Sequence, residues 1–159
     1  MRVDLPPDNP YANVPELAKL YDKGKELIQK GSLLVESKNI AGAADCYRDD
    51  AVIQFCNLPP TQPTRASKEN LLRWVFNMCE NIEAHIKGVN LADGQIVSEF
   101  NQVCHFKDGT TEVLPIVVTI RGDSALLETG KIGDMVLAGD FSTILPKAVL
   151  YAGPVPEVW

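Results

Sequence analysis

The sequence predicts an α+β fold in which helices come first and a meandering, curved sheet comes last. Between residues 43 and 58 a short helix ends on Tyr47, the acidic pair Asp49-Asp50 makes a turn, and an apolar strand follows. After residue 80, apolar segments alternate with Asp-Gly and Thr-Gly turns, where glycine supplies the positive φ that tight turns need. This order indicates a sheet curled into a cone, with helices that close its mouth around a pocket.

The composition is that of one globular domain. The chain has 159 residues, of which 45% are hydrophobic and 23% charged, enough to bury a substantial core. Its 15 basic and 21 acidic residues give a net charge of -6, so we expect no nucleic-acid partner. No apolar run approaches the roughly 18 residues of a membrane span, and the first residues lack a signal-peptide core. We therefore expect no membrane partner and a cytoplasmic location.

The cysteines do not form a metal-binding motif. Cys46, Cys56, Cys79 and Cys104 are widely spaced, and no Cys-x-x-Cys or His-x-x-x-His pair is present. Zinc sites need such close pairs. We expect buried free thiols, with no metal and no cofactor.

The first part of the chain predicts an irregular arm and then helices. Residues 1–14 contain three prolines. A helix then begins near Pro15, because proline is favoured in a first turn. Apolar residues continue at helical spacing through Val35, which leaves open one long helix or two helices with a break near Gly31. A second, short helix is predicted over 40–47.

The rest of the chain predicts one further helix among strands. A strand over 51–56 leads into a proline-rich loop over 57–64, which cannot be regular. Ser67 is predicted to cap a helix that runs to about Asn81. The strands predicted after it are 84–89, 95–106, 112–121, 125–127 and 134–141. Residues 145–159 are predicted to be irregular.

Six short motifs occur in order over residues 27–142. They are Tyr47-Arg48-Asp49-Asp50-Ala51-Val52-Ile53, Asn57-Leu58-Pro59-Pro60, Gly94-Gln95-Ile96-Val97-Ser98-Glu99, Lys107-Asp108-Gly109, Leu114-Pro115-Ile116 and Gly130-Lys131-Ile132. In this the chain resembles the SnoaL-like group of the nuclear-transport-factor-2-like (cystatin-like α+β) superfamily. The resemblance implies a strongly curved antiparallel sheet whose cone-shaped pocket is closed by three helices, and a homodimer through the convex face. It also implies an N-terminal arm with the start of the first helix at 1–22, a domain at 23–142 and an irregular tail at 143–159.

Alternation along the strands predicts which side chains face the pocket. In segment 99–106 the more apolar side carries Phe100 and Gln102, whereas His105 lies on the other side, as does His85 on its own strand. Helix positions Trp74 and Met78 are predicted to form a lid. The predicted ligand-binding residues are Ile53, Phe55, Asn57, Trp74, Met78, Phe100, Cys104, Leu114, Ile116, Val118, Met135 and Leu137.

The resemblance also allows the catalytic residues of known enzymes of the superfamily to be compared with the aligned positions of this chain. A limonene-epoxide hydrolase needs an arginine and two carboxylates, and the aligned positions here are Phe100, Gln102 and Leu137. A shift of one residue would bring in Glu99 and Asn101, which still supply no Arg–Asp pair. A ketosteroid isomerase needs a carboxylate base, a tyrosine and a protonated aspartate, and the aligned positions are Phe55, Gly31 and Val118. Neither set of catalytic residues is present.

The predicted function is a small-molecule pocket protein for a largely apolar partner. It is an isomerase, cyclase or dehydratase of specialised metabolism with a polyketide- or terpenoid-like substrate. The candidate catalytic residues are Gln102, which polarises a carbonyl or instead satisfies an internal hydrogen bond, and Asp140 and Tyr47, which move a proton. The alternative is a non-catalytic ligand-binding or dimerisation module. A third hypothesis is a protein-interaction partner of the nuclear-transport type.

Overall fold

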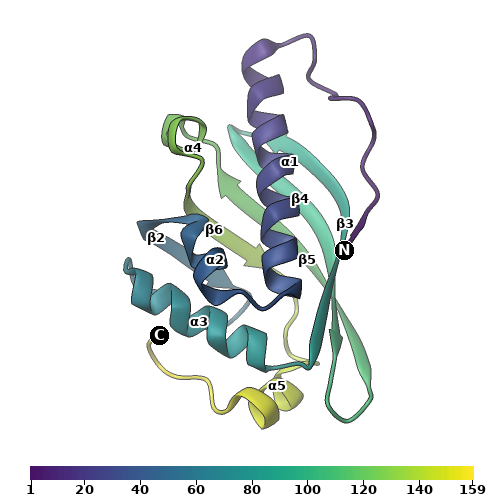
Figure 1. The fold of residues 1–159 in the computed structure, drawn as a ribbon, viewed down its shortest axis with the longest axis vertical. Coiled ribbons are helices and arrows are strands. Elements are labelled where there is room, and N and C mark those ends of the chain that lie inside the picture. The colour runs from purple at the N-terminus through teal and green to yellow at the C-terminus, as the bar shows by residue number, and fades with distance from the viewer.

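The computed structural model describes residues 1–159 as a six-stranded curved sheet with helices packed against one face (Figure 1). The strand order is β1-β3-β4-β5-β6-β2, and the predicted α+β class is confirmed. The two edge strands are parallel to their neighbours, whereas the central pairs are antiparallel. In chain order the elements are β1 (Arg2–Val3), α1 (Pro15–Glu36), α2 (Ile40–Asp45), β2 (Tyr47–Phe55), α3 (Arg65–Asn77), β3 (Asn81–Ala92), β4 (Gln95–His105), β5 (Thr111–Arg121), α4 (Ser124–Thr129), β6 (Ile132–Ala138) and α5 (Leu145–Ala152).

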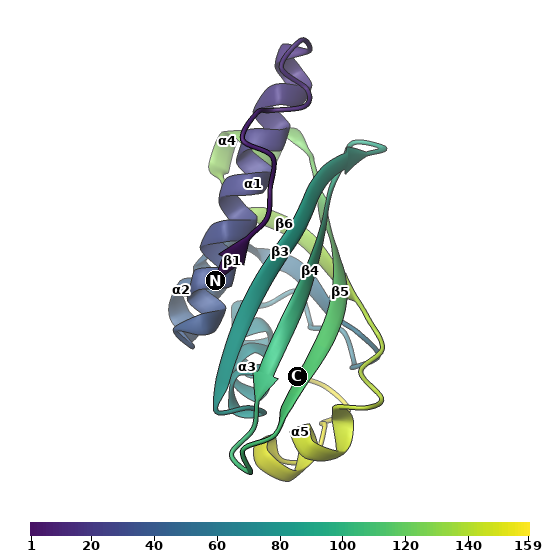
Figure 2. The same cartoon turned by 90° about the vertical axis from the view of Figure 1, so that its right-hand side faces the viewer.

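Helix α1 is continuous, so the break considered at Gly31 does not occur. It lies along the concave side of the long strands β3 and β4 (Figure 2). Its close approach depends on Gly24, because a Cβ at that position would lie 2.7 Å from Cγ2 of Ile96. The buried face of α1 consists of Leu20, Tyr21, Gly24, Leu27 and Ile28.

Helix α3 is capped by Thr64, three residues before the predicted cap. The Thr64 side chain accepts a hydrogen bond from the backbone N–H of Ser67, the usual geometry of a capping threonine. The Ser67 hydroxyl instead accepts from the Gln62 N–H at 2.8 Å and donates to the Trp159 carbonyl at 3.1 Å. The helix ends at Asn77 and not near Asn81 as predicted. Asn81 is instead the first residue of β3.

Segment 125–127, predicted as a strand, forms helix α4. Asp123 caps its start by accepting the Leu126 N–H at 2.9 Å, and Gly130 ends it with a φ of 69°. Aspartate before a helix and a left-handed glycine after it are strong helix boundaries. These two flanking residues outweigh the strand-like composition between them.

Both terminal segments are more regular than predicted. Residues 2–3 form β1, which pairs in parallel with β3, and residues 145–152 form α5. Helix α5 has Pro146 in its first turn, where proline costs no hydrogen bond. Strand β2 begins at Tyr47, four residues before the predicted start, and its pairing with β6 is irregular between Tyr47 and Val52.

Lys68 holds this irregular part of β2 against α3. Its side chain is fully buried, and its Nζ donates to the carbonyl oxygens of Asp49 at 2.5 Å, Ala51 at 3.0 Å and Thr64 at 3.0 Å. Burial lowers the pKa of this ammonium. Because a buried cation must have all its donors satisfied, the three carbonyls fix the path by which β2 enters the sheet.

We expect Lys68→Met to lower the free energy of unfolding by about 3 kcal/mol, because the buried Ala51 carbonyl and the partly buried carbonyls of Asp49 and Thr64 lose their donor. Chemical denaturation monitored by circular dichroism measures the change. The control is Lys19→Met on the exposed side of α1, which should stay within about 0.5 kcal/mol of the wild type. Equal effects of the two substitutions would contradict the role assigned to Lys68.

Candidate ligand-binding cavity

Helices α1, α2 and α3 and the concave face of the sheet enclose a cavity of about 120 Å³. Of the 23 residues that line it, 20 are hydrophobic. Phe100, Met135 and Leu137 point to the concave side yet remain only partly buried, because the helices do not cover this part of the sheet completely. The fold therefore contains an apolar hollow at the place where the sequence predicted a pocket.

The structure brings eight of the predicted site residues to this cavity. They come from all four strands whose side-chain alternation was used, β2, β4, β5 and β6. Whether they contact a ligand stays a prediction. These residues are Tyr47, Ile53, Phe55, Phe100, Gln102, Val118, Met135 and Leu137.

The predicted lid is not formed by Trp74 and Met78. Trp74 packs against Phe141 and Trp159, and its Nε1 donates to the Gly153 carbonyl at 3.0 Å. Met78 is fully buried outside the cavity lining. Helix α3 is rotated so that a neighbouring stripe faces the cavity, made of Leu71, Leu72, Val75 and Phe76.

Four other predicted residues lie away from the cavity. Cys104, Leu114 and Ile116 are inward-facing as predicted, but they are fully covered by neighbouring core residues. Asn57 is exposed in the loop after β2. Side-chain alternation predicts the face of a strand, but it does not predict which part of that face the helices cover.

The residues that the helices contribute to the lining were not predicted from the sequence. From α1 they include Leu27, Ile28, Gly31, Ser32 and Val35. The helical repeat of apolar residues, which had identified α1, contained this signal. From other elements the missed residues include Ala43, Cys46, Ile82, Ala84 and Ile132.

Gln102 carries the one side-chain amide in the lining. The residue is 4% exposed, and its Nε2 donates to Sγ of Cys104 at 3.5 Å. Its Oε1 accepts no hydrogen bond from the protein, and Gln102 is one of the residues that line the cavity.

Tyr47 places a phenol in the opposite part of the lining. Its hydroxyl donates to Sδ of Met135 at 3.6 Å, and burial raises the pKa of the phenol strongly. The hydroxyl is therefore neutral at physiological pH and can donate or accept a hydrogen bond, but it cannot serve as a base.

The structure does not bring Asp140 to the cavity. Strand β6 ends at Ala138, and the exposed carboxylate of Asp140 accepts hydrogen bonds from the backbone N–H of Ser142 at 3.0 Å and its hydroxyl at 2.6 Å. These hydrogen bonds lower the pKa of Asp140. The residue stabilises the turn toward α5, the structural role that is common for aspartate in turns.

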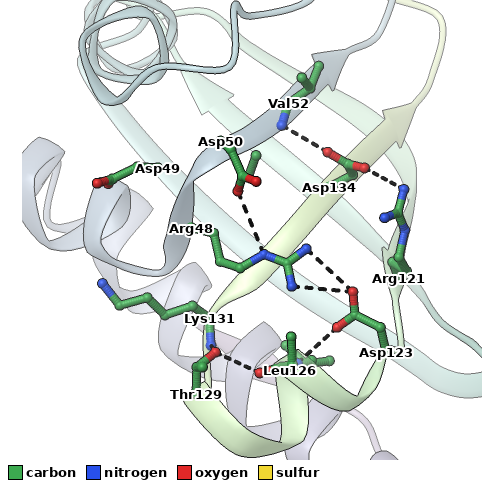
Figure 3. Close-up of polar contacts among 12 residues, drawn as sticks. Arg48, Asp49, Asp50, Val52, Arg121, Asp123, Leu126, Thr129, Lys131 and Asp134 are labelled. Atoms are coloured by element: carbon green, nitrogen blue, oxygen red, sulfur yellow. Dashed lines mark hydrogen bonds and ion pairs between the residues drawn. The ribbon is translucent and has the colours of Figure 1, made fainter.

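Most ionised side chains lie outside the cavity. Figure 3 shows the guanidinium of Arg48 between the carboxylates of Asp123 and Asp50. Nη1 of Arg48 is 3.3 Å from Oδ2 of Asp123, and Nε is 3.8 Å from Oδ1 of Asp50. Gly133 leaves room for this guanidinium, because a Cβ there would lie 2.0 Å from Nη2 of Arg48. In the same view Asp134 accepts from the Val52 N–H at 3.0 Å. This cluster joins α4, β2 and β6 and includes Asp50 of the acidic pair. The turn predicted at Asp49-Asp50 is wrong, because both residues belong to β2.

The two histidines lie on the outer side of the sheet, as the alternation predicted. Nε2 of His105 is 3.1 Å from Oε1 of Glu83, and Nε2 of His85 is 3.4 Å from Oε2 of the same residue. Hydrogen bonds from His105 and His85 lower the pKa of Glu83. These groups do not reach the cavity.

The thiols do not supply a reactive group to the cavity. All four cysteines are free, and Cys46, Cys79 and Cys104 are buried. A hydrogen bond with Cys104, together with burial, raises the pKa of Cys79, and burial raises the pKa of Cys46. Cys46 is the cysteine that lines the cavity, and a protonated thiol is a poor nucleophile. Cys104, whose pKa is lowered by its hydrogen bond with Cys79, lies outside the lining.

Comparisons with known proteins identify the fold. No protein-family model and no curated protein sequence matches the chain. A solved structure that does match is a hypothetical protein from Catenulispora acidiphila DSM 44928 with a ketosteroid isomerase-like fold, in complex with trimethylamine. The TM-score is 0.65 at 16% sequence identity, over 82% of this chain and 98% of that one. The chain therefore has a ketosteroid isomerase-like fold, as the resemblance implied. None of its helices has the length and apolar character required to cross a bilayer.

We expect Tyr47 to remain protonated when exposed tyrosines ionise near pH 10. Absorbance at 295 nm should then rise equally in the wild type and in Tyr47→Phe up to about pH 11. Because the folded-state pKa lies above the unfolded value, the stability that the protonated phenol contributes is present below about pH 10 and is lost as the pH rises further.

The denatured proteins are the control for this titration. After unfolding, the wild type should exceed Tyr47→Phe by the absorbance of one tyrosinate. A difference of about half that size already present in the folded proteins at pH 10, where an ordinary tyrosine is half ionised, would show that Tyr47 is accessible to solvent.

Proposed function

We propose that this protein binds one small, uncharged and largely apolar molecule in the cavity. The observation that carries the proposal is the chemistry of the lining, which contains no carboxylate, ammonium or guanidinium group. A charged ligand would lose its hydration there without a compensating partner. An apolar ligand instead gains the burial of its whole surface.

The volume of the cavity limits the size of the ligand. Its 120 Å³ is close to the roughly 150 Å³ of an engineered apolar cavity that binds benzene. A monocyclic terpenoid or a single-ring polyketide fragment of specialised metabolism is therefore a better candidate than a fused-ring compound.

The relative from Catenulispora acidiphila supports a small ligand for this fold, since it was solved with trimethylamine. Trimethylamine itself is not expected to bind here, because a protonated amine would find no carboxylate in this lining.

Binding without catalysis is better supported than the isomerase, cyclase or dehydratase hypothesis. Acid–base catalysis needs a base within hydrogen-bond reach of the substrate. In this lining the titratable groups are Cys46 and Tyr47, and burial raises the pKa of both. A catalytic role would rest on the orientation of a reactive substrate by the walls of the cavity.

We expect toluene to bind the wild type, and Ala84→Met to weaken this binding about tenfold or more, because the longer side chain occupies part of the cavity. Ala84 is 3% exposed and lines the cavity. Isothermal titration calorimetry measures the affinities. Ala66→Met, at an exposed position of α3, should leave the affinity unchanged. Undiminished binding by Ala84→Met would place the ligand elsewhere and refute the proposal.

We propose in addition that two copies of the chain associate through the convex face of the sheet. Val113, Val117 and Val136 are 52%, 40% and 46% exposed on this face. Strand register places Val117 beside Ala138, and Val136 beside Thr119, so the exposed apolar groups adjoin one another. A homodimer would remove this patch from water.

We expect Val117→Lys to convert the dimer into a monomer, because the interface would bury a charge. The lysine would lie beside Glu99 of β4, so the isolated chain should tolerate it. Sedimentation velocity measures the oligomeric state. Leu150→Lys is the matched control on α5, where Leu150 is 73% exposed. A monomeric wild type, or a dimeric Val117→Lys variant, would exclude this interface.

A further inference from the structure

We propose that the cavity selects a ligand that carries one hydroxyl group, which pairs with the side-chain amide of Gln102. The ligand class is then the small cyclic alcohols and phenols. This inference rests on the proposed function and assigns to Gln102 the choice between ligands of equal size.

The amide of Gln102 is incompletely satisfied by the protein. The amide has two N–H donors and one carbonyl oxygen. These groups make a single hydrogen bond to the protein, from Nε2 to Sγ of Cys104 at 3.5 Å. Sulfur is a weak acceptor. A polar group in a residue that is only 4% exposed normally finds a full partner, so the amide is in a position to gain one from a ligand.

The surroundings of Gln102 explain why no protein group supplies that partner. Its cross-strand neighbours are Ala84 on β3 and Leu114 on β5, and neither side chain has a donor or an acceptor. Phe100 is the next inward-facing residue on the same strand. The remaining free side of the amide is the cavity, in whose lining Gln102, Ala84 and Phe100 all take part.

A hydroxyl group is the polar group that suits this amide. It donates to the carbonyl oxygen and accepts from the N–H group, so it pairs with Gln102 in either of the two orientations that an amide can take. A carbonyl group can only accept. A carboxylate or an ammonium would bring a charge for which the lining offers no partner. An amide or a lactam would bring additional polar atoms into the same apolar walls.

The test compares two ligands of nearly equal shape, phenol and toluene, in the wild type and in Gln102→Leu. Calorimetry gives the ratio of the two dissociation constants for each protein. We expect this ratio to change by about tenfold in favour of toluene in Gln102→Leu, because the hydroxyl loses its partner. Gln95→Leu, at the exposed start of β4, should leave the ratio unchanged.

A second measurement needs no substitution. In the NMR spectrum of the wild type, the side-chain amide signals of Gln102 should shift on addition of phenol far more than on addition of toluene. An unchanged ratio in Gln102→Leu, with both ligands bound, would overturn this inference and leave the proposed function standing. If neither ligand binds the wild type, both fail.

Discussion

The spacing between helix α1 and the sheet is the constraint on which the rest of the structure depends. At Gly24 the helix approaches the sheet so closely that a Cβ would collide with Ile96, whereas a Cβ at Gly31 would meet nothing within 4 Å. These two glycines are seven residues apart and therefore lie on the same side of the helix. The helix is thus in tight contact with the sheet at Gly24, whereas Gly31 faces open space and lines the cavity. Part of the cavity therefore lies beside this glycine.

The distribution of charge follows from this arrangement. Residues that face the hollow are apolar almost throughout. Among its polar side chains, Tyr47 and Gln102 have only sulfur atoms as partners, whereas the Ser32 hydroxyl donates to the Ile28 carbonyl within α1. The ionised groups are paired outside it, as Arg48 is with Asp123 and Glu83 is with His105. Such a site can discriminate by size and by one hydrogen bond, but not by charge. This is why the structure favours an uncharged ligand and offers little for acid–base chemistry.

The sequence predicted most of the fold because its signals were local. The Asp-Gly turns and the alternation along segment 95–106 placed Phe100 and Gln102 on the inner face, and the structure confirms it. The errors arose where flanking residues or distant contacts decide. Asp123 and Gly130 make a helix of residues 124–129. Trp74 is drawn to Trp159 and Phe141, which lie far from it in the chain, so the lid predicted at that position is absent.

The sequence by itself determined most of the order of the elements and the faces of the strands. These properties depend on residue type and on spacing along the chain, which a sequence contains in full. Only the tertiary structure decided which inward-facing residues line a hollow and which are covered, that Asp140 lies outside the cavity, and that Gln102 keeps an unpaired carbonyl oxygen. Each of these depends on how closely a helix packs over a given part of the sheet, and that distance is set jointly by side chains from several elements.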